Sequence, residues 1–118
     1  MEYAYQHFTR ELLVEDLAWR GGPRPGQQMP EFDLPTTGGG RLRTADVTGV
    51  TPLLLTFGSV TCPMTADADP KLKHLHQRRG HRVAFATVYI REAHLGDLCP
   101  QPATIERKMR FAQALAMA

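Results

Sequence analysis

The stretch that decides the fold is Leu53-Leu-Leu-Thr-Phe-Gly-Ser-Val-Thr-Cys-Pro-Met-Thr65. Its first residues, 53–57, are apolar and β-prone and predict a buried strand, and Gly58-Ser59 then introduces a turn. Pro63 fits the first position of a helix, where its fixed φ is suitable and its missing N–H has no partner to lose. This order places Cys62 at a helix N-terminus, where the helix dipole and unpaired N–H groups favour an anionic, nucleophilic thiolate.

Downstream of this stretch, the pattern predicts a helix over residues 63–79 and a strand over residues 82–90. We expect Pro70 either to kink the helix or to start its main part after a short first turn. The predicted core residues of this helix are Ala66, Leu72 and Leu75. Residues 82–90 are nearly all apolar or β-branched, which is typical of a central strand covered on both faces. A final helix is predicted to begin after Thr104 as its cap.

Upstream, apolar residues at spacings of three and four predict an amphipathic helix from residue 3 to about 20. A connector rich in proline and glycine follows, and residues 29–47 predict a short β arm. We therefore divide the chain into an N-terminal helix with its linker, 1–25, and a domain over 26–118. Because strands alternate with helices, we expect an α/β sheet in which strands 53–57 and 82–90 run parallel.

The composition excludes several classes of protein. The chain has 118 residues, enough for one domain with a modest core, and its net charge of +2 is too small to indicate nucleic-acid binding. No apolar run approaches the length of a membrane span, and the N-terminus has no signal-peptide layout, so we expect a cytoplasmic protein without a membrane partner. The two cysteines, Cys62 and Cys99, are too few for a disulfide scaffold and lack the spacing of a zinc site, so we expect neither a metal nor another cofactor.

The candidate site lies at the carboxyl ends of the two parallel strands, where ligands gather in open α/β sheets. The first strand delivers Ser59, Thr61 and Cys62 to this edge, and the second delivers Glu92 and His94. A thiol beside an imidazole and a carboxylate is the general arrangement for activating a sulfur nucleophile and handling its proton.

Each candidate residue also has a plain structural interpretation. Cys62 can be a buried apolar residue, Glu92 a surface residue, and His94 a residue that bonds a loop carbonyl. Cys99 is either an idle thiol or a resolving partner that forms a disulfide with oxidised Cys62. Three further histidines, which we expect to face solvent, are His74, His76 and His81.

The two motifs together carry a resemblance to a known family. Phe57-Gly-Ser-Val-Thr-Cys-Pro63, followed by Val88-Tyr-Ile-Arg-Glu-Ala-His94 and Asp97, resembles the iodothyronine deiodinases and their bacterial relatives, which have a thioredoxin-type fold. Pro30-Glu-Phe-Asp-Leu-Pro35 is similar to the entry segment of peroxiredoxin-like proteins of the same superfamily. Cys62 stands where deiodinases carry selenocysteine. The resemblance implies that Glu92 and His94 are active-site residues.

The resemblance also implies a thioredoxin-like fold that is incomplete, because that fold has further strands and a closing helix after the segment that ends at Ala118. We expect either a truncated product or a homodimer that completes the sheet.

The leading hypothesis is a thiol oxidoreductase in which Cys62 attacks a peroxide, a disulfide or a carbon–halogen substrate. His94 shuttles the proton, Glu92 orients His94, and Ser59 and Thr61, next to Pro63, bond the substrate or thiolate. An external thiol or Cys99 then reduces the enzyme. The alternatives are a non-catalytic redox-sensing or protein-interaction module and, ranked last, a hydrolase with a Cys-His-Glu triad.

Overall fold

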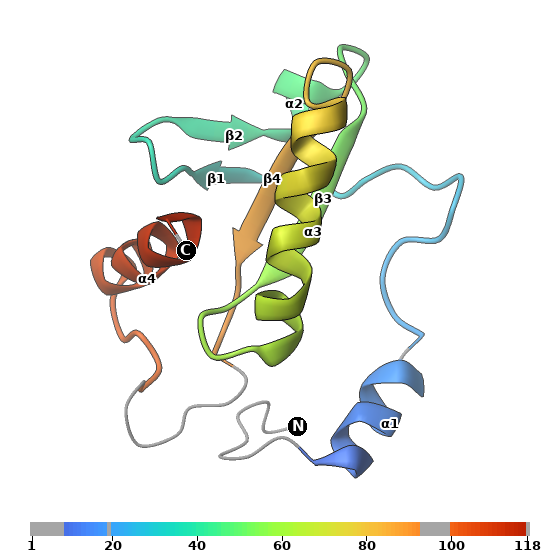
Figure 1. The fold of residues 1–118 in the computed structure, drawn as a ribbon. Coiled ribbons are helices and arrows are strands. Elements are labelled where there is room, and N and C mark those ends of the chain that lie inside the picture. The colour runs from blue at the N-terminus through green and yellow to red at the C-terminus, as the bar shows by residue number, and fades with distance from the viewer. Residues whose placement is uncertain (1–8, 19, 93–99, 118) are drawn as a thin grey trace.

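The chain is described by a computed structural model over residues 9–18, 20–92 and 100–117 (Figure 1). Its elements are, in order, α1 (Arg10–Ala18), β1 (Asp33–Pro35), β2 (Arg41–Arg43), α2 (Thr44–Val47), β3 (Leu53–Gly58), α3 (Pro63–Arg79), β4 (Ala84–Tyr89) and α4 (Ile105–Met117). The described elements are helices and two small two-stranded sheets, so the predicted mixed α/β class is confirmed. Among the described helices, none has the length and apolar character needed to cross a membrane.

Strands β3 and β4 are parallel neighbours, as the sequence predicts. Leu53 pairs with Ala84 at one end, and Gly58 pairs with Tyr89 at the other. The N–H of Ile90 donates to the carbonyl of Gly58 at 3.0 Å, which extends the ladder by one bond. Both strands therefore end at the same edge of the sheet, and the residues that follow them emerge side by side.

The β4 strand differs in one respect from the predicted central strand. In the described part of the chain it pairs with β3 alone, and its side chains are mostly half-buried rather than buried. A parallel pair without further strands covers little of its own surface, because coverage on both faces and both edges needs additional elements. Of the apolar side chains that are described, only that of Val47 is less than a tenth exposed.

Helix α3 crosses the β3–β4 pair and runs without interruption from Pro63 to Arg79 (Figure 1). Pro63 occupies the start of the helix, as predicted, and Pro70 lies inside it, so the expected restart of the helix at Pro70 is wrong. The Thr65 side chain of α3 lies close to Gly58, at the end of β3. A Cβ atom at Gly58 would lie 2.8 Å from the Cγ2 of Thr65, so a larger residue fits there only if the Thr65 side chain moves.

The prediction of core positions in α3 is wrong for two of its three residues. Ala66 and Leu75 are exposed, and Leu72 is half-buried. The face of α3 that lies over the strands includes Ala68, Leu72 and the ring of His76, whose edge meets Phe85 with the ring centroids 5.2 Å apart. His76 is nevertheless exposed, as the sequence predicts.

The predicted β arm is present as the antiparallel hairpin of β1 and β2. Arg41 donates from Nε to the carboxylate of Asp33 at 2.6 Å, and the guanidinium of Arg43 lies 3.4 Å from the same carboxylate. The hydrogen bond from Arg41, with the charges of both arginines, holds the pKa of Asp33 below its usual value. The last residues of the predicted arm, 44–47, are not extended and form the single helical turn α2 instead.

The terminal helices agree with the sequence in type and differ in extent. The helix predicted over residues 3–20 is described from Arg10 to Ala18, and its first residues lie outside the described part. Thr104 caps α4 as predicted, because its hydroxyl accepts the N–H of Arg107 at 3.3 Å. The backbone N–H of Glu106 and the hydroxyl of Thr104 bond the carboxylate of Glu106 and lower its pKa.

Candidate functional site

Cys62 is the N-cap residue of α3. Its backbone is extended (φ −85°, ψ 115°), its carbonyl accepts the N–H of Ala66 at 3.2 Å, and its own N–H donates to the carbonyl of Ser59 at 3.3 Å. The side chain is a free, half-buried thiol that makes no capping hydrogen bond to the first turn of the helix. The sulfur therefore lies at the N-terminus of a 17-residue helix, which is the positive end of the helix dipole, and it is not used in a capping hydrogen bond.

Glu92 connects the end of β4 to the residue before the cysteine. Its side chain is completely buried, and its Oε2 accepts the N–H of Thr61 at 2.9 Å and also the Thr61 hydroxyl. These bonds link segments 31 residues apart in the chain. A carboxylate that accepts two donors from one residue fixes the orientation of that residue, so Glu92 holds the backbone directly before Cys62.

Gln101 in turn fixes the backbone of Glu92. The Oε1 of Gln101 accepts the Glu92 N–H at 3.1 Å, and its Nε2 donates to the Glu92 carbonyl at 2.5 Å. A side-chain amide that exchanges both bonds with one residue acts in place of a neighbouring strand.

Three buried oxygens near this network have no hydrogen-bond partner among the described residues. They are Ser59 Oγ, Tyr89 Oη and Glu92 Oε1, and the side chains of Ser59 and Glu92 are almost completely inaccessible. An unpaired buried oxygen is costly, and such atoms in native structures are often found at functional sites. The backbone N–H of Ser59 does have a partner, the hydroxyl of Thr65 at 3.3 Å.

The thiol opens on a cavity of about 690 Å³ between α3, α4 and the strands. Most of the side chains that line it with Cys62 are apolar; they include Phe57, Met64, Leu72, Tyr89 and Leu115. A volume of this size accommodates a small organic molecule. Cys62 is thus accessible to a ligand in a mainly apolar environment.

The structure brings together most of the residues singled out from the sequence. Ser59, Thr61, Cys62 and Pro63 lie in one turn, and Glu92 is bonded to that turn. His94 and Cys99 lie outside the described residues, as does Asp97, so their predicted roles remain predictions.

In the structure, the backbone and the hydroxyl of Thr61 both donate hydrogen bonds to the carboxylate of Glu92. The sequence did not indicate this contact, nor the tie to Gln101. A signal for Gln101 is absent because a lone glutamine between two prolines has no distinctive spacing. The sequence predicts Tyr89 only as a residue of the second strand. In the structure it pairs with Gly58, which places it at the edge of the sheet that carries Cys62.

No group of three or more possible metal ligands is found among the residues with described positions. Comparison of the chain with protein-family models, with curated proteins and with solved structures finds no match.

Proposed function

We propose that the chain is a thiol-dependent oxidoreductase with Cys62 as the nucleophile and a thioredoxin-like fold of the deiodinase-related type. The observation that carries the proposal is the position of Cys62: a free thiol at the N-terminus of α3 that lines a cavity of about 690 Å³. The tie from Glu92 to Thr61 supports it, because it fixes the backbone next to the sulfur.

The simplest reaction for this arrangement is the reduction of a hydroperoxide. The Cys62 thiolate attacks the terminal oxygen of ROOH, a sulfur–oxygen bond forms, and the oxygen–oxygen bond breaks. The sulfur is oxidised by two electrons to a sulfenic acid, and the peroxide is reduced to the alcohol ROH after the leaving alkoxide takes up a proton. We assign the delivery of that proton to His94.

Regeneration requires a thiol reductant. A thiol attacks the sulfenic sulfur, water leaves, and the resulting disulfide is reduced by a second thiol. Cys99 or an external thiol supplies the first of these groups, and a disulfide or carbon–halogen substrate would enter at the same sulfur. A reducing compartment such as the cytoplasm would keep Cys62 free between turnovers.

The test is turnover of hydrogen peroxide with dithiothreitol by the full chain, compared with Cys62→Ser, Cys99→Ser and His94→Ala. We expect Cys62→Ser to abolish turnover. His94→Ala should slow it while leaving the protein folded. Equal peroxide consumption by the wild type and by Cys62→Ser would refute the proposal.

A second candidate function is a redox-sensing interaction module, favoured by the large apolar side chains exposed beside the thiol. Phe57 is 63% exposed and Met64 59% exposed, and exposed side chains of this kind are typical of partner-binding surfaces. In this case Cys62 would be oxidised once by peroxide without sustained turnover, and the oxidised chain would bind a protein partner differently from the reduced chain.

A further inference from the structure

The cavity beside Cys62 adjoins a second cavity of about 310 Å³ under the C-terminal half of α3. The same four residues line both: Thr56, Asp69, Leu72 and Thr87. We define the two together as the α3 groove. It lies between α3 and the side of the β3–β4 pair that α3 covers, and it begins at the reactive thiol.

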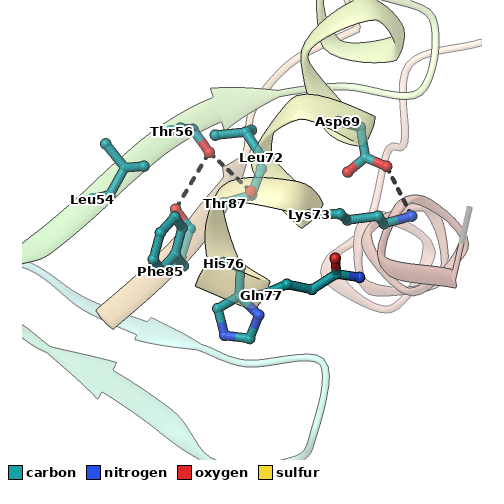
Figure 2. A pocket seen from close by; sticks show the side chains of 10 residues that line it. Leu54, Thr56, Asp69, Leu72, Lys73, His76, Gln77, Phe85 and Thr87 are labelled. Carbon is teal, nitrogen blue, oxygen red and sulfur yellow. Dashed lines mark hydrogen bonds and ion pairs between the residues drawn. The ribbon is translucent and has the colours of Figure 1, made fainter. Parts of the chain in front are cut away.

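The two ends of the α3 groove differ in chemistry. The end at Cys62 is mainly apolar, whereas Lys73, His76 and Gln77 line the far end, as Figure 2 shows. The Nζ of Lys73 lies 2.9 Å from the Asp69 carboxylate, and a lysine ammonium has two further N–H donors. The far end therefore keeps hydrogen-bond donors for a ligand.

The middle of the groove contains a pair of hydroxyls in otherwise apolar strands. Thr56 and Thr87 are partners in the strand register, and their hydroxyl oxygens lie 2.9 Å apart (Figure 2). The Thr56 side chain is half-buried and its hydroxyl also bonds the carbonyl of Ala86 at 3.4 Å, whereas the Thr87 side chain is exposed. Two hydroxyls that satisfy each other are compatible with a chain passing over them.

The far end supplies donors for an anion. Its acidic side chain, Asp69, is already paired with Lys73, whose ammonium keeps two further N–H donors, and the side-chain amide of Gln77 lines the same end. A terminal carboxylate matches this end better than an amine does.

We propose that the α3 groove binds a linear aliphatic carboxylate, with the carboxylate at Lys73 and the chain directed toward Cys62. The distance along α3 from Met64 to Lys73 is about 14 Å at 1.5 Å per residue, enough for a medium-length acyl chain. Resting on the function proposed above, the substrate class is the hydroperoxide of such an acid. Cys62 takes the terminal peroxide oxygen and is oxidised to the sulfenic acid, the hydroxy acid leaves, and a thiol reduces the sulfur.

Binding is tested with decanoate as the probe and decanol as the neutral control of equal chain length. The readout is protection of Cys62 from iodoacetamide, followed by mass spectrometry, with calorimetry as a second readout. We expect decanoate to protect Cys62, and Lys73→Gln to weaken decanoate binding roughly two- to fivefold, the range for a half-exposed ion pair. Lys71→Gln is the matched control, because Lys71 pairs with Asp67 in the same i,i+4 arrangement and does not line the groove.

The second experiment measures the reaction and compares a hydroperoxide of decanoic acid with tert-butyl hydroperoxide. Lys73→Gln should slow oxidation of Cys62 by the first and leave the second unchanged. Equal protection by decanoate and decanol, no effect of Lys73→Gln, or no protection at all would each overturn the inference. Such a failure leaves oxidation of Cys62 by hydrogen peroxide intact, whereas failure of the proposed function leaves decanoate binding intact.

Discussion

Replacement of Glu92 is the sharpest perturbation of the candidate site. Its carboxylate is completely buried and accepts both the N–H and the hydroxyl of Thr61. Leaving a buried donor unpaired costs about 1–3 kcal/mol, and Thr61 is half-buried, so we expect Glu92→Ala to destabilise the chain by about 2–4 kcal/mol. Glu92→Gln keeps the shape and one acceptor oxygen, and should cost about 1 kcal/mol because a neutral acceptor is weaker.

The assay is urea unfolding at neutral pH, combined with the alkylation rate of Cys62 in the folded state. Both variants should be less stable than the wild type, and Glu92→Ala should lose more stability than Glu92→Gln. Glu92→Ala should also change the alkylation rate, because the backbone before Cys62 is no longer fixed. Glu31→Gln, at an exposed position before β1, is the control and should match the wild type. A Glu92→Ala variant within about 0.5 kcal/mol of the wild type, as expected for an ordinary surface change, would refute the reasoning.

Three further predictions concern other parts of the chain. Gly58→Ala places a Cβ 2.8 Å from a side chain of α3 and should cost about 1–3 kcal/mol in urea unfolding; an unchanged midpoint would mean that α3 does not approach so closely. Gln101→Ala removes both bonds to the Glu92 backbone and should lower stability by about 1–2 kcal/mol, and an unchanged melting temperature would argue against the tie. Arg41→Gln should raise the pKa of Asp33 toward its usual 3.8 in an NMR titration. Because the folded-state pKa is lowered, the stabilisation by this pair is present above pH 3.8 and is lost as the pH falls through the lowered value; a titration of Asp33 unaffected by Arg41→Gln would contradict the assignment.

Local patterns in the sequence were sufficient to predict the element that presents the cysteine. An apolar run, a Gly-Ser turn and a cysteine before proline each have a direct backbone consequence, and together they place Cys62 at the start of α3. The parallel pairing of β3 with β4 followed from the same reasoning, since a strand–helix–strand unit returns to the same sheet.

The packing of α3 could not be predicted in the same way. Its sequence is polar on most sides, so periodicity indicated Leu75, whereas the face toward the strands carries Ala68, Leu72 and His76. In a helix with few apolar residues, the covered face is decided by what the strands present. Here the missing side chain of Gly58 leaves room for the side chain of Thr65.

The hydrogen-bond network of the site depends on contacts between distant segments, which spacing alone does not specify. The sequence predicted that Glu92 would reach the same edge as Cys62, and it does. It could not indicate that both Thr61 donors meet a single oxygen of Glu92, or that Gln101 holds the Glu92 backbone. These ties depend on side-chain geometry after the strands have paired.

The activation of Cys62 by the fold is tested by the rate at which hydrogen peroxide oxidises this thiol in the folded chain. The sulfenic acid is trapped with dimedone and located by mass spectrometry, and the reference is a peptide of residues 57–67, which has the same thiol without α3 or Glu92. We expect faster oxidation in the folded chain than in the peptide, with the difference reduced in Glu92→Ala. Equal or slower oxidation in the folded chain would contradict it, because the fold would then do nothing to activate Cys62.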